Sequence, residues 1–111
     1  MKHSITTRKE GFQIDIGKYT LSIGCGFGHY CENYTGSFDK DNKPTNSMEV
    51  ALMERDTSNF VVLDQDVAAY IPCSRLAKLI VAVEREDWKM FCDLCDAEMK
   101  DITKCMGSAY A

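Results

Sequence analysis

The chain has 111 residues, of which 45% are hydrophobic and 27% charged, and its formal net charge is −4. This length and composition predict one globular domain over residues 1–111, with room for one hydrophobic core. The acidic balance argues against nucleic-acid binding, which depends on Lys and Arg at phosphates, and favours basic protein surfaces as partners.

The first residues, MKHSITTRKEGF, contain no apolar run, so we expect neither a signal peptide nor a membrane anchor. No stretch reaches the roughly 18 apolar residues that a membrane-spanning helix needs. The protein is therefore expected in the cytosol, without a membrane partner. In that compartment its six cysteines should stay reduced.

Alternating apolar and polar residues predict two β-hairpins. Residues 12–16 and 19–23 alternate on either side of the turn signal Gly17-Lys18. Residues 48–54 and the β-branched run 60–63 predict a second hairpin across a turn at 55–59. The polar residues 36–47 between the hairpins are expected to form a surface loop.

After Pro72 the apolar residues change to a helical period. A first helix face has the spacing i, i+3, i+4 and i+7, at Leu76, Leu79, Ile80 and Val83. A second helix is predicted from Trp88 to about Cys105, with Asp87 as its N-cap. Because strands come first and helices last, we predict an α+β fold. An antiparallel sheet of about four strands should carry two C-terminal helices on one face.

The stretch GCGFGHYCENYTG, residues 24–36, is rich in glycine. It does not match a P-loop, because no Lys-Ser or Lys-Thr pair follows. A dinucleotide-binding turn would need its third glycine where His29 stands. We therefore interpret the glycines as allowing a tight turn or a close backbone approach at a strand end.

The same stretch mixes aromatic with small polar residues, a composition typical of binding loops. The predicted contact residues are Phe27, His29, Tyr30, Asn33 and Tyr34. The alternative, that these aromatics fold back over the edge of the sheet, stays open. In a second hypothesis this loop binds a small ligand such as a nucleotide. Its backbone N–H groups would hold phosphate and its aromatics would stack on the base, at a site between subunits of a homo-oligomer.

Cysteine spacing raises a third hypothesis, a small zinc-binding module. Cys92 and Cys95 form a C-x-x-C pair, and Cys25, His29 and Cys31 could complete the ligand set. However, the pair falls on the apolar stripe of the predicted second helix, where cysteines behave as small hydrophobic side chains. We therefore expect no metal and no cofactor.

Catalysis is not expected either. Nucleophilic catalysis needs a Cys or Ser with a base within reach, and the chain has only two histidines. A pairing of His29 with Cys25 or Cys31 is the only dyad that the sequence suggests. We therefore expect the protein not to be an enzyme.

Acidic residues dominate the predicted second helix. Residues 84–104 hold seven acids and four bases. Such a face is usually a solvated outer surface. The functional alternative is an acidic surface that steers a basic partner, with Asp93, Asp96 and Asp101 as contact residues.

Four stretches follow one another along the chain: H-Y-C-E-N-Y after the glycine turn, M-E-V-A-L, F-V-V-L, and the predicted helix S-R-L-A-K-L-I-V-A-V. Over residues 19–85 this arrangement resembles small uncharacterised accessory proteins of tailed bacteriophages. The resemblance implies a protein made in the host bacterial cytosol that binds and inhibits a host defence or replication protein. The leading expectation is therefore a non-enzymatic inhibitor that uses the aromatic loop and the acidic helix.

Overall fold

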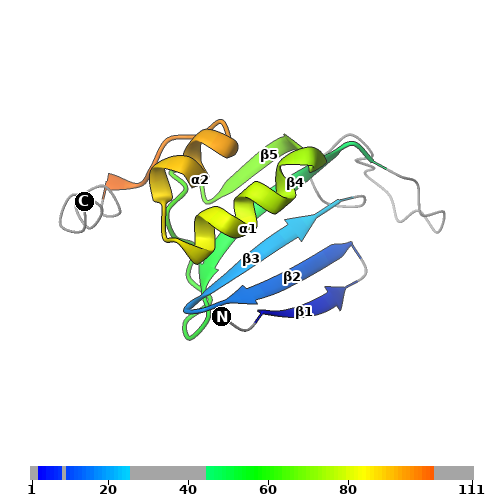
Figure 1. Ribbon diagram of the computed structural model, residues 1–111, viewed down its shortest axis with the longest axis horizontal. Helices are drawn as coiled ribbons and strands as arrows, with labels where there is room; N and C mark the ends of the chain where they lie inside the picture. Colours follow the sequence, from blue (N-terminus) through cyan, green and yellow to red (C-terminus); the bar gives the residue numbers. More distant parts are fainter. Residues whose placement is uncertain (1–2, 9, 26–44, 102–111) are drawn as a thin grey trace.

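Five antiparallel strands form one sheet in the computed structural model, which describes residues 3–8, 10–25 and 45–101 (Figure 1). The strands lie in the order in which they follow along the chain, so each pairs with the next. They are β1 (His3–Arg8), β2 (Gly11–Ile16), β3 (Tyr19–Gly24), β4 (Ser47–Glu54) and β5 (Val67–Pro72). After them come the short 3-10 helix η1 (Cys73–Arg75) and the helices α1 (Leu76–Glu84) and α2 (Trp88–Leu94).

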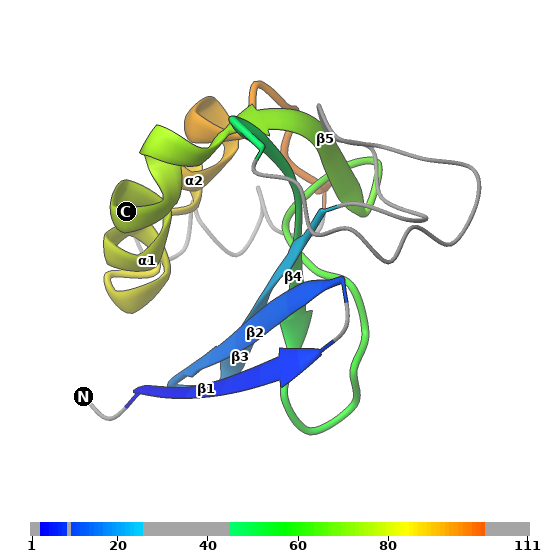
Figure 2. The same ribbon diagram turned by 90° about the vertical axis from the view of Figure 1, so that its right-hand side faces the viewer.

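Both α-helices lie on the same side of the sheet (Figure 2). This arrangement confirms the predicted α+β fold, with one more strand than expected. The core lies between the two layers. Its largest fully buried side chains come from the sheet and from both helices, among them Ile16, Leu21, Leu52, Leu79 and Phe91. Burying each such side chain contributes about 1.5–3 kcal/mol, so this interface is the main source of stability.

The predicted first hairpin is confirmed. Residues Ile14 and Leu21 face each other across β2 and β3, and both are buried beneath the helices. Gly17, the first of the two turn residues, has a φ of 59°. A positive φ at this position is typical of a tight two-residue hairpin and costs glycine little.

Strand β1 was not predicted, because its sequence HSITTR contains a single large apolar residue. It pairs with β2, with Arg8 opposite Gly11. Gly11 has a φ of 140°, and a Cβ atom there would lie 2.0 Å from the carbonyl oxygen of Ile23. Only glycine therefore fits at position 11, where β2 lies between β1 and the end of β3.

The second predicted hairpin is partly wrong. Of the predicted strand 60–63, Phe60 forms a bridge with Met53 and the Val61 N–H bonds the Leu52 carbonyl at 2.9 Å. The chain then leaves the sheet at Val62, whose φ is 73°. It returns only as β5, which pairs with the first half of β4. The edge partner of β4 is thus one strand interrupted by residues 62–66.

Strand β5 contains a bulge. Met48 pairs with Ile71 and Val50 with Ala68, so two residues of β5 stand opposite one residue of β4. Tyr70 lies in this bulge with a φ of 56°, and 57% of it is exposed. Pro72 is the last residue of β5 and directly precedes η1. A bulge of this kind re-aims a side chain and ends regular pairing.

Helix α2 begins where predicted but ends early. The Asp87 side chain accepts a hydrogen bond from the Met90 N–H at 3.1 Å, which confirms it as N-cap. The helix ends at Leu94. The prediction that it continues to about Cys105 is therefore wrong, because residues 95–100 are not helical, while residues 102–111 lie outside the described part of the chain. The Ala97 N–H bonds the Cys92 carbonyl and the Asp96 N–H bonds the Asp93 carbonyl. With Asp96 at a φ of 50°, this is a Schellman termination.

Candidate functional site

The five predicted contact residues of the aromatic loop lie outside the described residues, as does Cys31. They are Phe27, His29, Tyr30, Asn33 and Tyr34. Most of the predicted surface loop 36–47 lies outside them as well. Cys25 follows β3 directly and is half-buried. The aromatic-loop hypothesis therefore stays a prediction.

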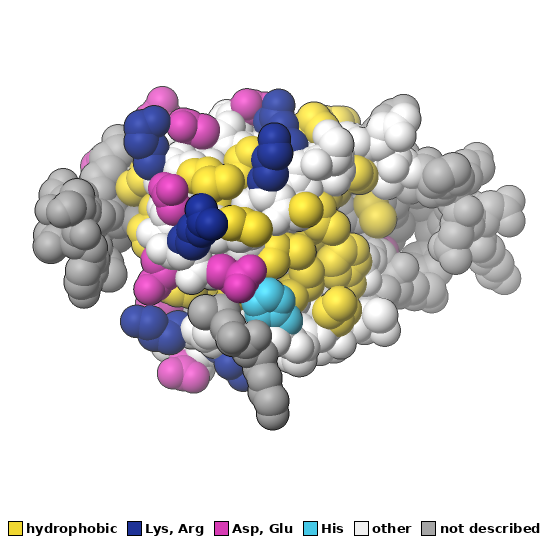
Figure 3. Space-filling view, viewed as in Figure 1, with side chains coloured by type: hydrophobic (Ala, Val, Ile, Leu, Met, Phe, Trp, Pro, Cys, Tyr) yellow, Lys and Arg dark blue, Asp and Glu magenta, His cyan; other side chains and the backbone are white. Residues whose placement is uncertain are grey.

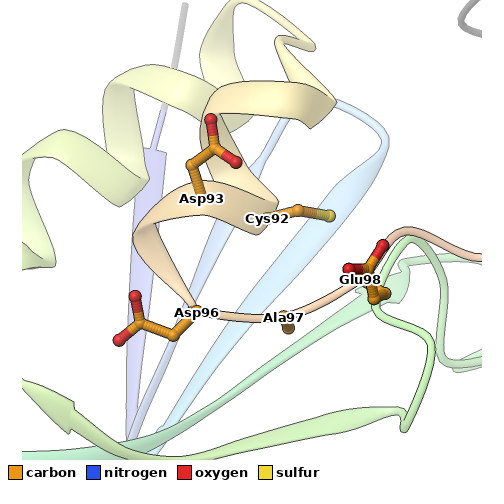
Figure 4. A pocket seen from close by; sticks show the side chains of 5 residues that line it. All are labelled: Cys92, Asp93, Asp96, Ala97 and Glu98. Atoms are coloured by element: carbon orange, nitrogen blue, oxygen red, sulfur yellow. The ribbon is translucent and has the colours of Figure 1, made fainter.

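The predicted acidic residues are described, and the structure brings two of them together. Asp93 on α2 and Asp96 in the turn after it line a hollow of about 270 Å³, together with Cys92, Ala97 and Glu98 (Figure 4). Asp101 is exposed further along the chain and does not line this hollow. Glu98 is the site residue that the prediction omitted. Its signal was present in the sequence, since it belongs to the same run of acids.

The three carboxylates of the hollow do not converge. Figure 4 shows the side chains of Asp93, Asp96 and Glu98 pointing in different directions around it. The side chains of Asp93 and Asp96 are each 68% exposed. A hard cation such as Ca²⁺ is held by several oxygens that converge on one point. This arrangement instead offers separate negative charges over a wider surface.

Two of these carboxylates have basic neighbours. Lys89 lies 3.1 Å from Asp93, one helical turn away, and Arg75 lies 2.8 Å from Asp96. Exposed pairs of this kind are worth little, typically about 0.2–1 kcal/mol, so a partner's cations can compete for the same oxygens. Arg75 also donates to the Leu94 carbonyl at 2.8 Å, which joins η1 to the end of α2.

The C-x-x-C pair lies beneath this acidic surface, not on it. Cys92 and Cys95 are both buried in the core cluster, as the apolar stripe predicted, although Cys95 caps the helix and does not lie in its middle. Burial, reinforced by Cys92 and Asp96 nearby, raises the pKa of the Cys95 thiol to about 12. At neutral pH this thiol therefore stays protonated, whereas a nucleophile or metal ligand must be a thiolate.

No group of three His, Cys, Asp or Glu side chains in residues 3–8, 10–25 and 45–101 is placed to hold a metal ion. Two of the suggested zinc ligands, His29 and Cys31, lie outside the described residues, so the zinc hypothesis stays a prediction. His3, the histidine that is described, lies 3.5 Å from Glu84 at the edge of the sheet. Its neighbour is thus a carboxylate on α1.

Comparisons with protein-family models, with curated proteins and with solved structures found no match to this chain. Over the described residues, every helix is too short or too polar to cross a membrane.

Proposed function

We propose that this protein is a non-enzymatic binding protein that docks the acidic surface at the end of α2 on a basic surface of another protein. The observation that carries this proposal is the set of exposed, divergent carboxylates of Asp93, Asp96 and Glu98 around one shallow hollow. Lysine and arginine side chains spread over a protein surface can each meet one such carboxylate. Charges arranged in this way increase association rates and select partners of opposite sign.

The acidic surface stands on a rigid support. Phe91 of α2 is fully buried, and the Trp88 ring meets it edge to face with the ring centres 6.3 Å apart. Trp88 in turn packs edge to face on Tyr19 of β3, at 4.9 Å. Arg75 fixes the far end of the helix through the Leu94 carbonyl. Preorganised charges lose little freedom on binding, which favours a stable complex.

The resemblance to bacteriophage accessory proteins suggests the kind of partner. On this proposal the protein inhibits a bacterial host protein, for example a defence or replication factor, by covering a basic surface that this factor needs. Such an inhibitor acts stoichiometrically and needs no cofactor. The aromatic loop would supply a second set of contacts.

The test is capture of the partner from a bacterial lysate, followed by binding kinetics with two matched variants. One carries Asp93→Lys with Glu98→Lys, which reverses charge at the hollow. The other carries Glu54→Lys with Asp56→Lys, which changes the net charge equally at the far end of β4. Both members of the control pair are exposed.

We expect the first variant to bind at least about tenfold more weakly, mainly through a slower association rate, and the control to bind nearly as wild type. The wild-type association rate should fall as salt is raised, because exposed charges are screened. Equal affinity of both variants, or a salt-independent rate, contradicts the proposal.

A further inference from the structure

The two edges of the sheet differ in how they are finished. Strand β5 carries the bulge at Tyr70 and ends in Pro72, two devices that discourage another strand from pairing. Strand β1 has neither: its six residues run in unbroken register with β2 and include no proline. Among the described residues, no further strand pairs with the outer side of β1. A regular, unprotected edge of this kind offers unpaired N–H and C=O groups with which another strand can pair.

The backbone groups that β1 offers outward can be identified from the ladder. The Cys25 N–H bonds the Glu10 carbonyl at 2.9 Å, so Glu10 and every second residue after it turn their backbone groups toward β3. The alternate residues of β2 therefore turn theirs toward β1, where they meet Ser4, Thr6 and Arg8. By the same alternation, His3, Ile5 and Thr7 present their N–H and C=O groups to the outside.

An apolar surface accompanies this open edge. Ile5 pairs with Ile14 and so lies on the helix-bearing face, yet 65% of it is exposed. Helix α1 packs over β2 and β3 and meets β1 at His3, which lies 3.5 Å from Glu84, so Ile5 stays mostly exposed. Figure 3 shows apolar side chains gathered on this face. A strand that pairs with β1 can therefore form apolar contacts with this face in addition to backbone hydrogen bonds.

We propose that β1 is the interface of a symmetric homodimer, in which the β1 strands of two copies pair antiparallel. Ile5 lies on the two-fold axis opposite Ile5 of the second copy, and His3 lies opposite Thr7 of the second copy. The outward groups of the three residues then satisfy one another in about six hydrogen bonds. The two sheets join into one continuous sheet of ten strands, and the two Ile5 side chains pack together.

A second copy fits this edge better than an unrelated strand for reasons of charge and closure. The chain is acidic overall, but β1 contains no carboxylate, and the acids that contact it, Asp15 and Glu84, are paired with Ser4 and His3, which limits repulsion between acids when two copies approach. The acidic end of α2 lies on the β5 side, away from β1 (Figures 1 and 2). Because the β5 edge is closed, pairing stops at two copies and does not continue into a fibre.

The test compares the solution mass of the full chain with that of Thr7→Pro and of Thr7→Ala, by light scattering or sedimentation over a range of concentrations. Proline at position 7 removes one outward N–H and places its ring in the path of the second strand. It leaves the bonds between β1 and β2 intact, since the Thr7 N–H points away from β2. Alanine at the same position keeps the N–H and is the matched control.

We expect wild type and Thr7→Ala at twice the chain mass of 12.5 kDa, and Thr7→Pro as a monomer or with dimerisation at least about tenfold weaker. Circular dichroism confirms that the proline variant is folded. Amide exchange gives a second measurement that does not depend on that variant. In the wild-type dimer the Ile5 and Thr7 amides exchange slowly, and dilution to monomer speeds their exchange while leaving Thr6 protected.

Two results would overturn the proposal. A wild-type chain that stays monomeric at high concentration shows that β1 does not pair with a second copy. A dimer whose mass and amide protection are the same in Thr7→Pro forms through a different surface. Neither result bears on the acidic surface of α2, so this proposal and the proposed function stand or fall separately.

Discussion

At the scale of single residues, Cys95 carries a thiol, a potentially reactive group, in a buried position that keeps it unreactive. Its side chain is only 2% exposed and belongs to the core cluster. The C-x-x-C spacing suggested metal or redox chemistry, whereas the apolar stripe around it suggested packing. The buried position favours the second interpretation, because desolvation penalises the thiolate.

The raised pKa of Cys95 predicts how stability changes with pH. Below pH 9, the ordinary value of the group, the thiol is protonated in both folded and unfolded chains. Above it the unfolded chain releases the proton, while the folded chain keeps it until about pH 12. Alkali therefore favours unfolding, by about 1 kcal/mol from this group at pH 10.

This pH effect can be measured by urea denaturation in reductant at pH 8 and pH 10, for wild type and Cys95→Ala. We expect the difference in unfolding free energy between the two proteins to shift by about 1 kcal/mol against wild type at the higher pH. Lysines and tyrosines titrate in both proteins, so their contribution cancels. An unchanged difference would mean that Cys95 ionises normally in the folded chain.

At the scale of elements, both helices end in the same way. The Asp87 N–H bonds the Ala82 carbonyl and the Glu86 N–H bonds the Val83 carbonyl, so α1 has the same Schellman termination as α2. Glu86, with a φ of 51°, takes the left-handed position that glycine usually fills. An acidic residue there gives no stop signal in the sequence. Asp96 holds the same position after α2, with a φ of 50°, and it too gives no stop signal. This is why the predicted second helix ran past Leu94.

Glycine at position 86 should therefore stabilise the protein relative to alanine. A residue with a Cβ atom costs about 1 kcal/mol or more in this conformation. Glu86→Gly and Glu86→Ala both lose the hydrogen bond that Tyr19 donates to the Glu86 carboxylate, so their difference isolates the backbone effect. We expect the glycine variant to be about 1 kcal/mol more stable by thermal or urea unfolding. Inside a helix the order is reversed, so alanine as the more stable variant would exclude a left-handed position 86.

The strands show where sequence patterns succeed and where they fail. Residues 12–16 and 19–23 were predictable because one face of each is buried and the other is polar. Strand β1 was not, because residues 3–7 are all exposed, and a strand without a buried face shows no alternation. The run 60–63 looked like a strand because it is β-branched. Its second half, Val62 and Leu63, is buried in the core and pairs with residues 98–100, about 35 positions away, and no local pattern encodes such a contact.

At the scale of the whole molecule, the C-terminal segment closes the fold by pairing with the segment between β4 and β5. Leu63 and Met99 form a bridge, flanked by a bond from the Asp64 N–H to the Glu98 carbonyl at 3.0 Å. The Lys100 N–H bonds the Val62 carbonyl at 2.7 Å. The paired segments 62–64 and 98–100 form a short two-stranded ribbon. The acidic surface therefore lies between α2 and this ribbon. Its sign and exposure were predictable from composition, but its shape depends on a pairing that the sequence did not reveal.

Lys100 is the side chain that ties this ribbon to the sheet. Its Nζ donates to the Phe60 carbonyl at 3.1 Å and forms an ion pair with Asp66, and only 26% of its side chain is exposed. We expect Lys100→Met to lower the free energy of unfolding by about 1 kcal/mol, because a partly buried pair and a charged hydrogen bond are both lost.

Lys89→Met makes the same chemical change at an 85% exposed side chain, where the pair with Asp93 is worth about 0.3–0.5 kcal/mol. Urea unfolding of both variants decides the matter, since equal losses would mean that the ribbon is not held through Lys100. If the ribbon does loosen, residues 98–100 separate from 62–64 and Glu98 moves relative to Asp93. On the proposed function Lys100→Met should then also weaken partner binding, although it removes a positive charge and makes the surface more acidic. Stronger binding by this variant would show that net charge alone, and not the arrangement of the carboxylates, governs recognition.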